Sequence, residues 1–129
     1  MQRFEQLFIV FLIGFIIYPI LEILWRGHTH WTMAVAGGLC VLTLFLIYTK
    51  FDQTPIWVKC LIGAVVITSI EFIFGCIFNL VLKWNVWDYS SRPGNILGQV
   101  CIQYAAVWAV LSLPIIFLSD FLKDLFSKM

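Results

Sequence analysis

Charged residues are scarce in this chain of 129 amino acids: they make up 12% of it, whereas soluble domains have about 25%. The sequence also lacks a large net charge, since its formal charge at pH 7 is +1. A protein that binds the phosphate backbone of nucleic acid needs a basic surface, so we expect no nucleic-acid partner. The chain is apolar instead: 62% of its residues are hydrophobic, and its mean hydropathy is +0.98. This composition is typical of a membrane protein.

Several enzyme motifs are missing as well. The sequence has no GxxxxGK[ST], so the chain cannot itself be the ATPase of a pump, and it has no GxSxG nucleophile turn. His28 and His30 invite a metal interpretation, but no HExxH or CxxC accompanies them. The four cysteines lie singly in or beside apolar segments and are most simply small packing residues, at Cys40, Cys60, Cys76 and Cys101. We therefore expect no bound metal and no cofactor.

Four apolar segments are long enough to cross a bilayer, which takes a helix of about 20 residues. They lie at about residues 4–25, 31–49, 56–82 and 96–119. The sequence thus predicts an all-α fold, an integral membrane bundle of four transmembrane helices in a single domain over residues 1–129. Residues 119–128 continue with apolar side chains on one helical face and charged ones on the other, which indicates a short amphipathic, interfacial extension.

The distribution of Lys and Arg predicts which side of the membrane the termini face. The side with both termini and the second connection carries five of these residues, and the other side carries three. The first group is Arg3, Lys50, Lys59, Lys123 and Lys128, and the second is Arg26, Lys83 and Arg92. We expect a multi-pass cell-membrane protein with both termini in the cytoplasm. Insertion in both orientations, with antiparallel dimers, stays open.

Glu71 is the most unusual residue of the apolar segments. It lies about 11 residues before the outer end of the third segment, which places it about 16 Å deep at the rise of an α-helix. A charged group at this depth is costly, so it needs a partner or a function. Gly75 and Asn79 follow at helical spacing on the same face, and Thr68 extends that face inward. Gly75 would leave space there for a ligand, a water or a neighbouring backbone.

Other polar residues gather at the same end of the predicted bundle. Glu22 and Arg26 have i, i+4 spacing and can pair, and Pro19 is expected to bend their helix. The WDYSSRPGN stretch at residues 87–95 is expected to form the lid of a polar pocket, held in place by Asp88 and Arg92. The candidate ligand-binding residues are Glu22, Arg26, His30, Glu71, Asn79, Asp88, Tyr89, Arg92, Asn95, Gln99 and Gln103.

Simpler interpretations stay open for many of these residues. Glu22 and Arg26 could form a structural ion pair at a helix end. Asp88 could only shape a turn, and Asn79 and Gln103 could only join helices. An aromatic belt at the membrane interface would explain four tryptophans, Trp25, Trp31, Trp84 and Trp87.

Three longer stretches form an ordered set of motifs: YPILEILWRGHTHWTMAVAGGL at residues 18–39, EFIFGCIFN at 71–79 and VWDYSSRPGNILGQVC at 86–101. In this order they resemble the ABC-transporter type IV family of small multi-pass bacterial membrane proteins. The WDYS stretch, followed by a proline, an asparagine and GQ, is the most specific part. The resemblance implies a permease-like protein. It also implies the family's motif positions, which here are Glu22, Arg26, His30, Glu71, Asn79, Asp88, Tyr89, Asn95 and Gln99.

These features together predict a permease-like protein that binds or transports a small polar or cationic solute through a polar pocket on the outer half of the bundle. Glu71 would be the ion- or proton-linked acid, and nearby tryptophan and tyrosine could hold an organic cation. Besides the lipid bilayer, we expect a homodimer or a partner membrane subunit, because four helices are few to enclose a pathway. Two alternatives stay open. One is a membrane enzyme that acts on a lipid or lipid-linked substrate, with His28, His30 and Asp88 in acid–base or metal roles, although the sequence favours a protein that is not an enzyme. The other is an accessory subunit of a larger transporter.

Overall fold

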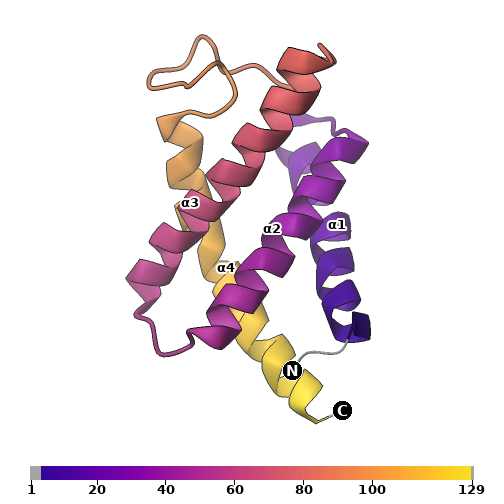
Figure 1. The fold of residues 1–129 in the computed structure, drawn as a ribbon, viewed down its shortest axis with the longest axis vertical. Coiled ribbons are helices and arrows are strands. Elements are labelled where there is room, and N and C mark those ends of the chain that lie inside the picture. The colour runs from indigo at the N-terminus through magenta and orange to yellow at the C-terminus, as the bar shows by residue number, and fades with distance from the viewer. Residues whose placement is uncertain (1–3, 129) are drawn as a thin grey trace. The chain divides into compact units, whose positions relative to one another are not determined.

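The computed structural model describes residues 4–128, and most of them are helical (Figure 1). The π-helix η1 follows α3 directly, and a loop of residues 82–101 leads from it to the last helix. The elements in chain order are α1 (Phe4–Arg26), α2 (Trp31–Lys50), α3 (Ile56–Gly75), η1 (Cys76–Val81) and α4 (Ile102–Ser127). The predicted all-α fold with four long helices is confirmed.

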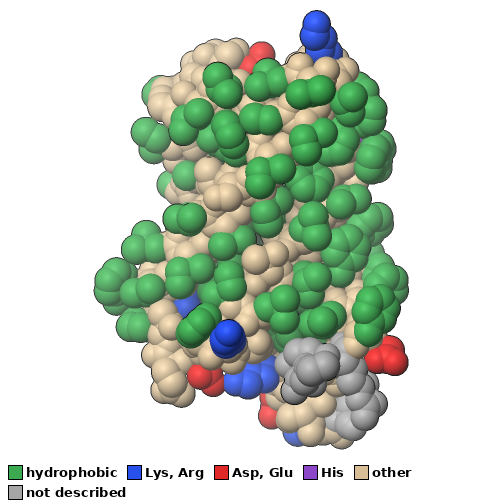
Figure 2. Space-filling model, in the orientation of Figure 1, with side chains coloured by type: hydrophobic (Ala, Val, Ile, Leu, Met, Phe, Trp, Pro, Cys, Tyr) green, Lys and Arg blue, Asp and Glu red, His purple; other side chains and the backbone are tan. Residues whose placement is uncertain are grey.

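All four helical stretches are long and apolar enough to cross a membrane, with α3 and η1 counted together as one span, Ile56–Val81. Large apolar side chains on these helices are open to the surroundings, for example Leu24 at 79%, Val65 at 66% and Val110 at 68% exposure. Figure 2 shows a face made mainly of hydrophobic side chains with few charged ones. Helices that are apolar on their outer faces are stable in lipid rather than in water. The chain is a multi-pass membrane protein.

The structure forms two compact units, and the first consists of Met1–Pro55 with Pro114–Met129. Within it, α1 and α2 are antiparallel and pack closely. The helices approach each other so closely at Gly14 that a side chain there would overlap the carbonyl oxygen of Gly37 on the facing helix. Small residues at such crossings are a common feature of membrane helix pairs. The end of α4 joins this unit through a core of Val10, Phe45, Leu122 and Phe126.

The second unit, Ile56–Leu113, contains α3, η1, the loop and the first half of α4. The helix changes from α to π after Gly75, and Lys83 and Asn85 then take left-handed backbone angles, with φ of 58° and 53°. Left-handed residues end a right-handed helix, so the chain leaves the helical path here. Whether the two units make up the predicted single domain stays a prediction.

The predicted start of the fourth helix, at about residue 96, is wrong by six residues, since α4 begins at Ile102. The residues before it form a tight turn in which the amide of Ile96 donates to the carbonyl of Val100 at 3.0 Å. Leu97 and Gly98 have φ of 55° and 72°, which no right-handed helix accommodates. Apolar composition alone could not show this, because Ile96 and Leu97 are as suited to a membrane helix as the residues that follow them.

The amphipathic segment predicted at residues 119–128 is present as the last turns of α4, which continues without interruption through Ser127. Its apolar face divides between two environments: Leu122 and Phe126 are buried in the core of the first unit, whereas Phe121 and Leu125 are exposed. Packing against α1 and α2 therefore fixes this end of the helix, in addition to any contact with the membrane surface.

Candidate functional site

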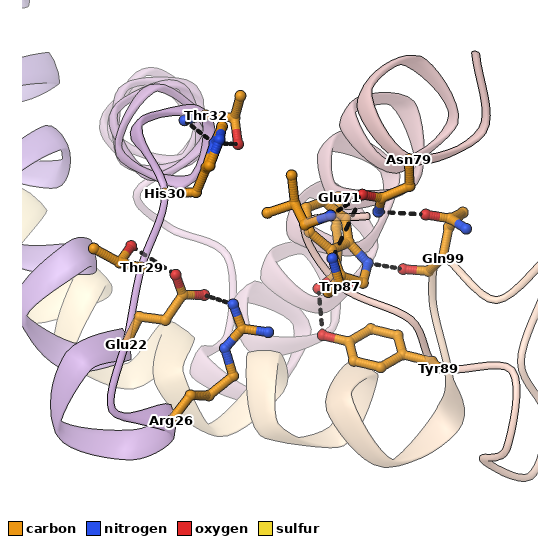
Figure 3. A network of polar contacts seen from close by, with 11 residues as sticks. Glu22, Arg26, Thr29, His30, Thr32, Glu71, Asn79, Trp87, Tyr89 and Gln99 are labelled. Atoms are coloured by element: carbon orange, nitrogen blue, oxygen red, sulfur yellow. Dashed lines mark hydrogen bonds and ion pairs between the residues drawn. The ribbon is translucent and has the colours of Figure 1, made fainter. Parts of the chain in front are cut away.

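Glu71 is buried in α3, with 6% of its surface exposed, and both of its carboxylate oxygens accept hydrogen bonds. The phenol of Tyr89, from the loop, donates to Oε2 at 3.0 Å, and Figure 3 shows its ring directed at the carboxylate. The indole Nε1 of Trp108, from α4, donates to Oε1 at 3.2 Å. Three segments far apart in the sequence thus meet at one buried acid. Charge-assisted bonds of this kind are stronger than neutral ones, so they stabilise the carboxylate and fix its orientation.

The two donors to Glu71 belong to a row of aromatic rings. Tyr89 stacks on Tyr104 with 5.0 Å between ring centroids and an interplanar angle of 13°. Tyr104 in turn lies 5.9 Å from Trp108, one helical turn further along α4. We call Glu71, Tyr89, Tyr104 and Trp108 the acid–aromatic cluster. The cluster thus places a carboxylate close to aromatic rings, and both kinds of group can attract cations.

Arg92 lies at the edge of this cluster, with its guanidinium 5.2 Å from the ring centroid of Tyr104. Its Nη1 also donates to Oε1 of Gln103 at 2.6 Å. Arg92 therefore attaches the loop to the first turn of α4. It forms no ion pair with Asp88 among the residues that the structure describes.

A second set of hydrogen bonds holds the base of the loop. The side-chain amide of Asn79, within η1, donates to Oε1 of Gln99 at 2.8 Å and accepts from the backbone N–H of Val86 at 2.6 Å. The indole of Trp87 donates to the carbonyl of Gln99 at 2.9 Å, as Figure 3 shows. Trp87 and Gln99 are buried. In each of these hydrogen bonds at least one partner is a loop residue. Asn79 thus anchors the loop to η1, the helix that precedes it.

The space predicted at Gly75 for a ligand, a water or a neighbouring backbone is filled by two side chains. A Cβ at this position would lie 2.5 Å from Oε1 of Gln99 and 3.0 Å from the ring of Trp87. Glycine is required here because the amide that bonds Asn79 passes directly over the helix backbone. The expectation of an open space was wrong, because Trp87 and Gln99 of the loop cover the face of α3 at Gly75.

Asp88 is exposed and forms a local turn in which its Oδ1 accepts the backbone N–H of Ser90 at 2.8 Å. This backbone hydrogen bond, and then the one from the Ser90 side chain, lowers the pKa of Asp88 below its usual range. The contact is typical of a turn-shaping aspartate. That Asp88 and Arg92 hold the loop over a pocket stays a prediction; of the two, Arg92 is the one that contacts α4, at Gln103 and Tyr104.

Asn95 likewise shapes the loop. Its side-chain amide donates to the carbonyl of Arg92 at 2.8 Å and to that of Ser90 at 3.2 Å, and its Oδ1 accepts the N–H of Gly98 at 3.0 Å. The compact fold of this segment thus depends on amide and carboxylate side chains that bond their own neighbours.

A separate polar cluster lies in the first unit, where α1 turns into α2. Glu22 is buried and pairs with Arg26 at 3.4 Å, as the spacing predicts. Its other oxygen accepts the hydroxyl of Thr29 at 2.7 Å, as seen in Figure 3. Nδ1 of His30 accepts the backbone N–H of Thr32 at 3.3 Å and so caps the start of α2. That this cluster and the acid–aromatic cluster line one pocket stays a prediction.

Within the described range 4–128, no group of three or more His, Cys, Asp and Glu residues is placed to hold a metal ion. His28 is exposed in the connection between α1 and α2, and His30 serves as a helix cap. The arrangement offers hydrogen bonds and ring faces to a ligand rather than a set of metal ligands.

Sequence reasoning missed three participants, Tyr104, Trp108 and Thr29. Tyr104 and Trp108 have i, i+4 spacing, a signal that would have marked one aromatic face of α4. Thr29 follows Glu22 by seven residues across a connection, and no helical spacing could reveal that contact.

A family described as Putative ABC-transporter type IV matches residues 32–129. The chain belongs to this family. No curated protein and no solved structure matches it. The match includes the whole second unit with the acid–aromatic cluster, whereas Glu22, Arg26 and His30 lie before its first residue. With its four apolar helices, this membership makes the chain a transport-related membrane protein.

Proposed function

We propose that this protein binds a small organic cation at the acid–aromatic cluster and acts as a permease-like component of a transport system. The single observation that carries the proposal is the buried carboxylate of Glu71, held between the O–H of Tyr89 and the N–H of Trp108. Both of these donors are neutral groups, and a carboxylate buried in an apolar segment is a favourable partner for a cation.

The rings of the cluster supply the second part of a cation site. Cations bind to the faces of tryptophan and tyrosine, and the attraction increases to about 2 kcal/mol where water is excluded. The guanidinium of Arg92, 5.2 Å from the centroid of Tyr104, demonstrates that this ring row already accepts a positive group. A free ammonium would combine the same ring attraction with the charge of Glu71.

Glu71 is also the residue through which we propose that transport is linked to an ion or a proton. A carboxylate that binds a cationic solute can bind a proton in its place, so occupation by one excludes the other. The loop that carries Tyr89 closes over the acid and would have to move for exchange. Of the two donors Tyr89 and Trp108, Tyr89 comes from a loop and Trp108 from a helix.

For orientation, we propose that the protein lies in the cell membrane with both termini in the cytoplasm and the loop of residues 82–101 outside. The bias of Lys and Arg towards the terminal side supports this. The cluster would then open towards the outer half of the membrane. Four helices are few to enclose a pathway, so we propose that a second copy or a partner membrane subunit completes it.

The test is equilibrium binding of radiolabelled methylammonium to purified protein in detergent micelles. We expect saturable binding by the wild type and a loss of at least about tenfold in affinity for Glu71→Gln, which corresponds to about 1.4 kcal/mol. The matched control is Glu5→Gln, because Glu5 is an exposed acid in the first turn of α1. Thermal unfolding of each variant checks that it is folded. Equal affinities for wild type and a folded Glu71→Gln variant would overturn the proposal.

A further inference from the structure

The hydroxyl of Thr68 differs from three other hydroxyls in the helices of this protein. Its Oγ1 is buried and has no hydrogen-bond partner among the residues that the structure describes. Three other hydroxyls donate to the carbonyl one turn earlier in their own helices: Thr49 to Phe45 at 2.8 Å, Ser69 to Val65 at 2.7 Å, and Ser112 to Trp108 at 2.8 Å. Thr68 lies beside Ser69 in α3, yet it does not use this ordinary solution.

An unpartnered hydroxyl is unfavourable in a membrane protein, where no bulk water is available to it. Burial of a hydroxyl without a hydrogen bond therefore destabilises the folded protein. Threonine in a helix can avoid the cost, because one of its preferred rotamers places Oγ1 against a backbone carbonyl. Groups left in this state are candidates for contact with a bound molecule.

Thr68 precedes Glu71 by three residues, so both lie on one face of α3, one turn apart. The acid–aromatic cluster is therefore flanked by a buried oxygen that can accept a hydrogen bond. The two observations are independent, since one concerns the donors to the Glu71 carboxylate and the other a hydroxyl without any donor.

We infer that the Thr68 hydroxyl accepts an N–H of the cation bound at Glu71, so that the solute is a primary or secondary ammonium rather than a quaternary one. This inference rests on the proposed function and names its substrate class. An ammonium with N–H groups donates to the carboxylate and to the hydroxyl at once. A quaternary ammonium keeps the charge and the ring attraction, but it has no donor and leaves the hydroxyl unpartnered.

The experiment measures dissociation constants for methylammonium and tetramethylammonium with the wild type, Thr68→Val and Thr68→Ser in micelles. Valine matches the shape of threonine without its hydroxyl, and serine keeps the hydroxyl. We expect the wild type to prefer methylammonium, Thr68→Val to lose about tenfold in methylammonium affinity with tetramethylammonium unchanged, and Thr68→Ser to recover the preference. Thr49→Val is the control, because its hydroxyl is satisfied within α2.

The outcomes separate this inference from the proposed function. If Thr68→Val binds methylammonium as the wild type does, or lowers both affinities equally, the role of the hydroxyl is overturned while Glu71 can still be a cation site. If the wild type binds neither cation, the proposed function fails and this inference fails with it. A preference of the wild type for tetramethylammonium overturns the substrate class alone.

Discussion

Tyr89 and Glu71 are 18 residues apart, and the phenolic O–H of the one donates to Oε2 of the other at 3.0 Å. This bond attaches the loop of residues 82–101 to an acid inside an apolar helix that is long enough to span a membrane. It makes the loop part of the environment of Glu71, so the position of the loop and the state of the acid depend on each other. The same phenol ring stacks on Tyr104, which extends the connection to α4.

Removal of the Tyr89 hydroxyl alone should therefore weaken both the loop and the site. Tyr89→Phe keeps the ring on Tyr104 but leaves Oε2 of Glu71 without its phenol donor, and we expect a loss of about 1 kcal/mol in unfolding free energy. Tyr89→Leu also removes the stacking and should cost more. Denaturant unfolding and methylammonium binding measure both effects. A Tyr89→Phe protein that equals the wild type in both would show that the bond contributes nothing.

Gly75→Ala should destabilise the protein by about 1–3 kcal/mol, because the added methyl group overlaps the side chain of Gln99 beside the ring of Trp87. The damage should concentrate in the loop. Limited proteolysis after Lys83 then reports the loop, and thermal unfolding reports the whole chain. Unchanged protection and an unchanged melting temperature would mean that Gln99 can move aside without cost.

Asp88→Asn should leave cation binding unchanged, since an asparagine can accept the same backbone N–H from Ser90. Asp88 also predicts a pH dependence, because its pKa in the folded protein is lowered from 3.8. The ionised carboxylate therefore stabilises the loop above pH 3.8, and this stabilisation is lost as the pH falls through the lower pKa of the folded state. Carboxyl NMR titration measures the midpoint. A midpoint at or above 3.8 contradicts the turn geometry.

Accessibility of single cysteines tests the orientation. Ser91 and Ser127 are both exposed, so each can report as a cysteine after the native cysteines are replaced. We expect an impermeant thiol reagent added to intact cells to label Ser91→Cys and not Ser127→Cys. The reverse pattern would place the termini outside, and partial labelling of both sites would indicate insertion in two orientations.

The helices could be predicted from the sequence because length and hydropathy decide which segments cross a membrane. Glu71 could be singled out for a related reason, since an acid in such a segment needs special partners. The identity of those partners could not be predicted: Trp108 and Tyr104 are ordinary residues for a membrane helix, and only the tertiary fold brings them to α3. The loop could not be predicted either, because its turn at Leu97 and Gly98 depends on backbone angles that the apolar pattern of the sequence does not indicate.

The prediction of ligand-binding residues from the sequence had a similar limit. Asn79, Asn95 and Gln99 stand out as polar residues in an apolar chain, which suggested ligand binding, yet their hydrogen bonds serve the loop. Amides can satisfy a backbone or a solute equally well, so composition cannot separate the two roles. A buried carboxylate is a more specific signal, because an acid in an apolar segment is costly unless it has a partner or a function.

The most direct test of the central claim uses the indole N–H of Trp108, which donates to Glu71 and so reports on the carboxylate. Its NMR resonance, in isotope-labelled protein and assigned with Trp108→Phe, is followed while methylammonium is added. The account predicts a saturable shift for Trp108, none for the exposed Trp57 of α3, and no saturable shift in Glu71→Gln. A Trp108 resonance that does not respond in the wild type, or that responds equally in Glu71→Gln, would contradict cation binding at Glu71.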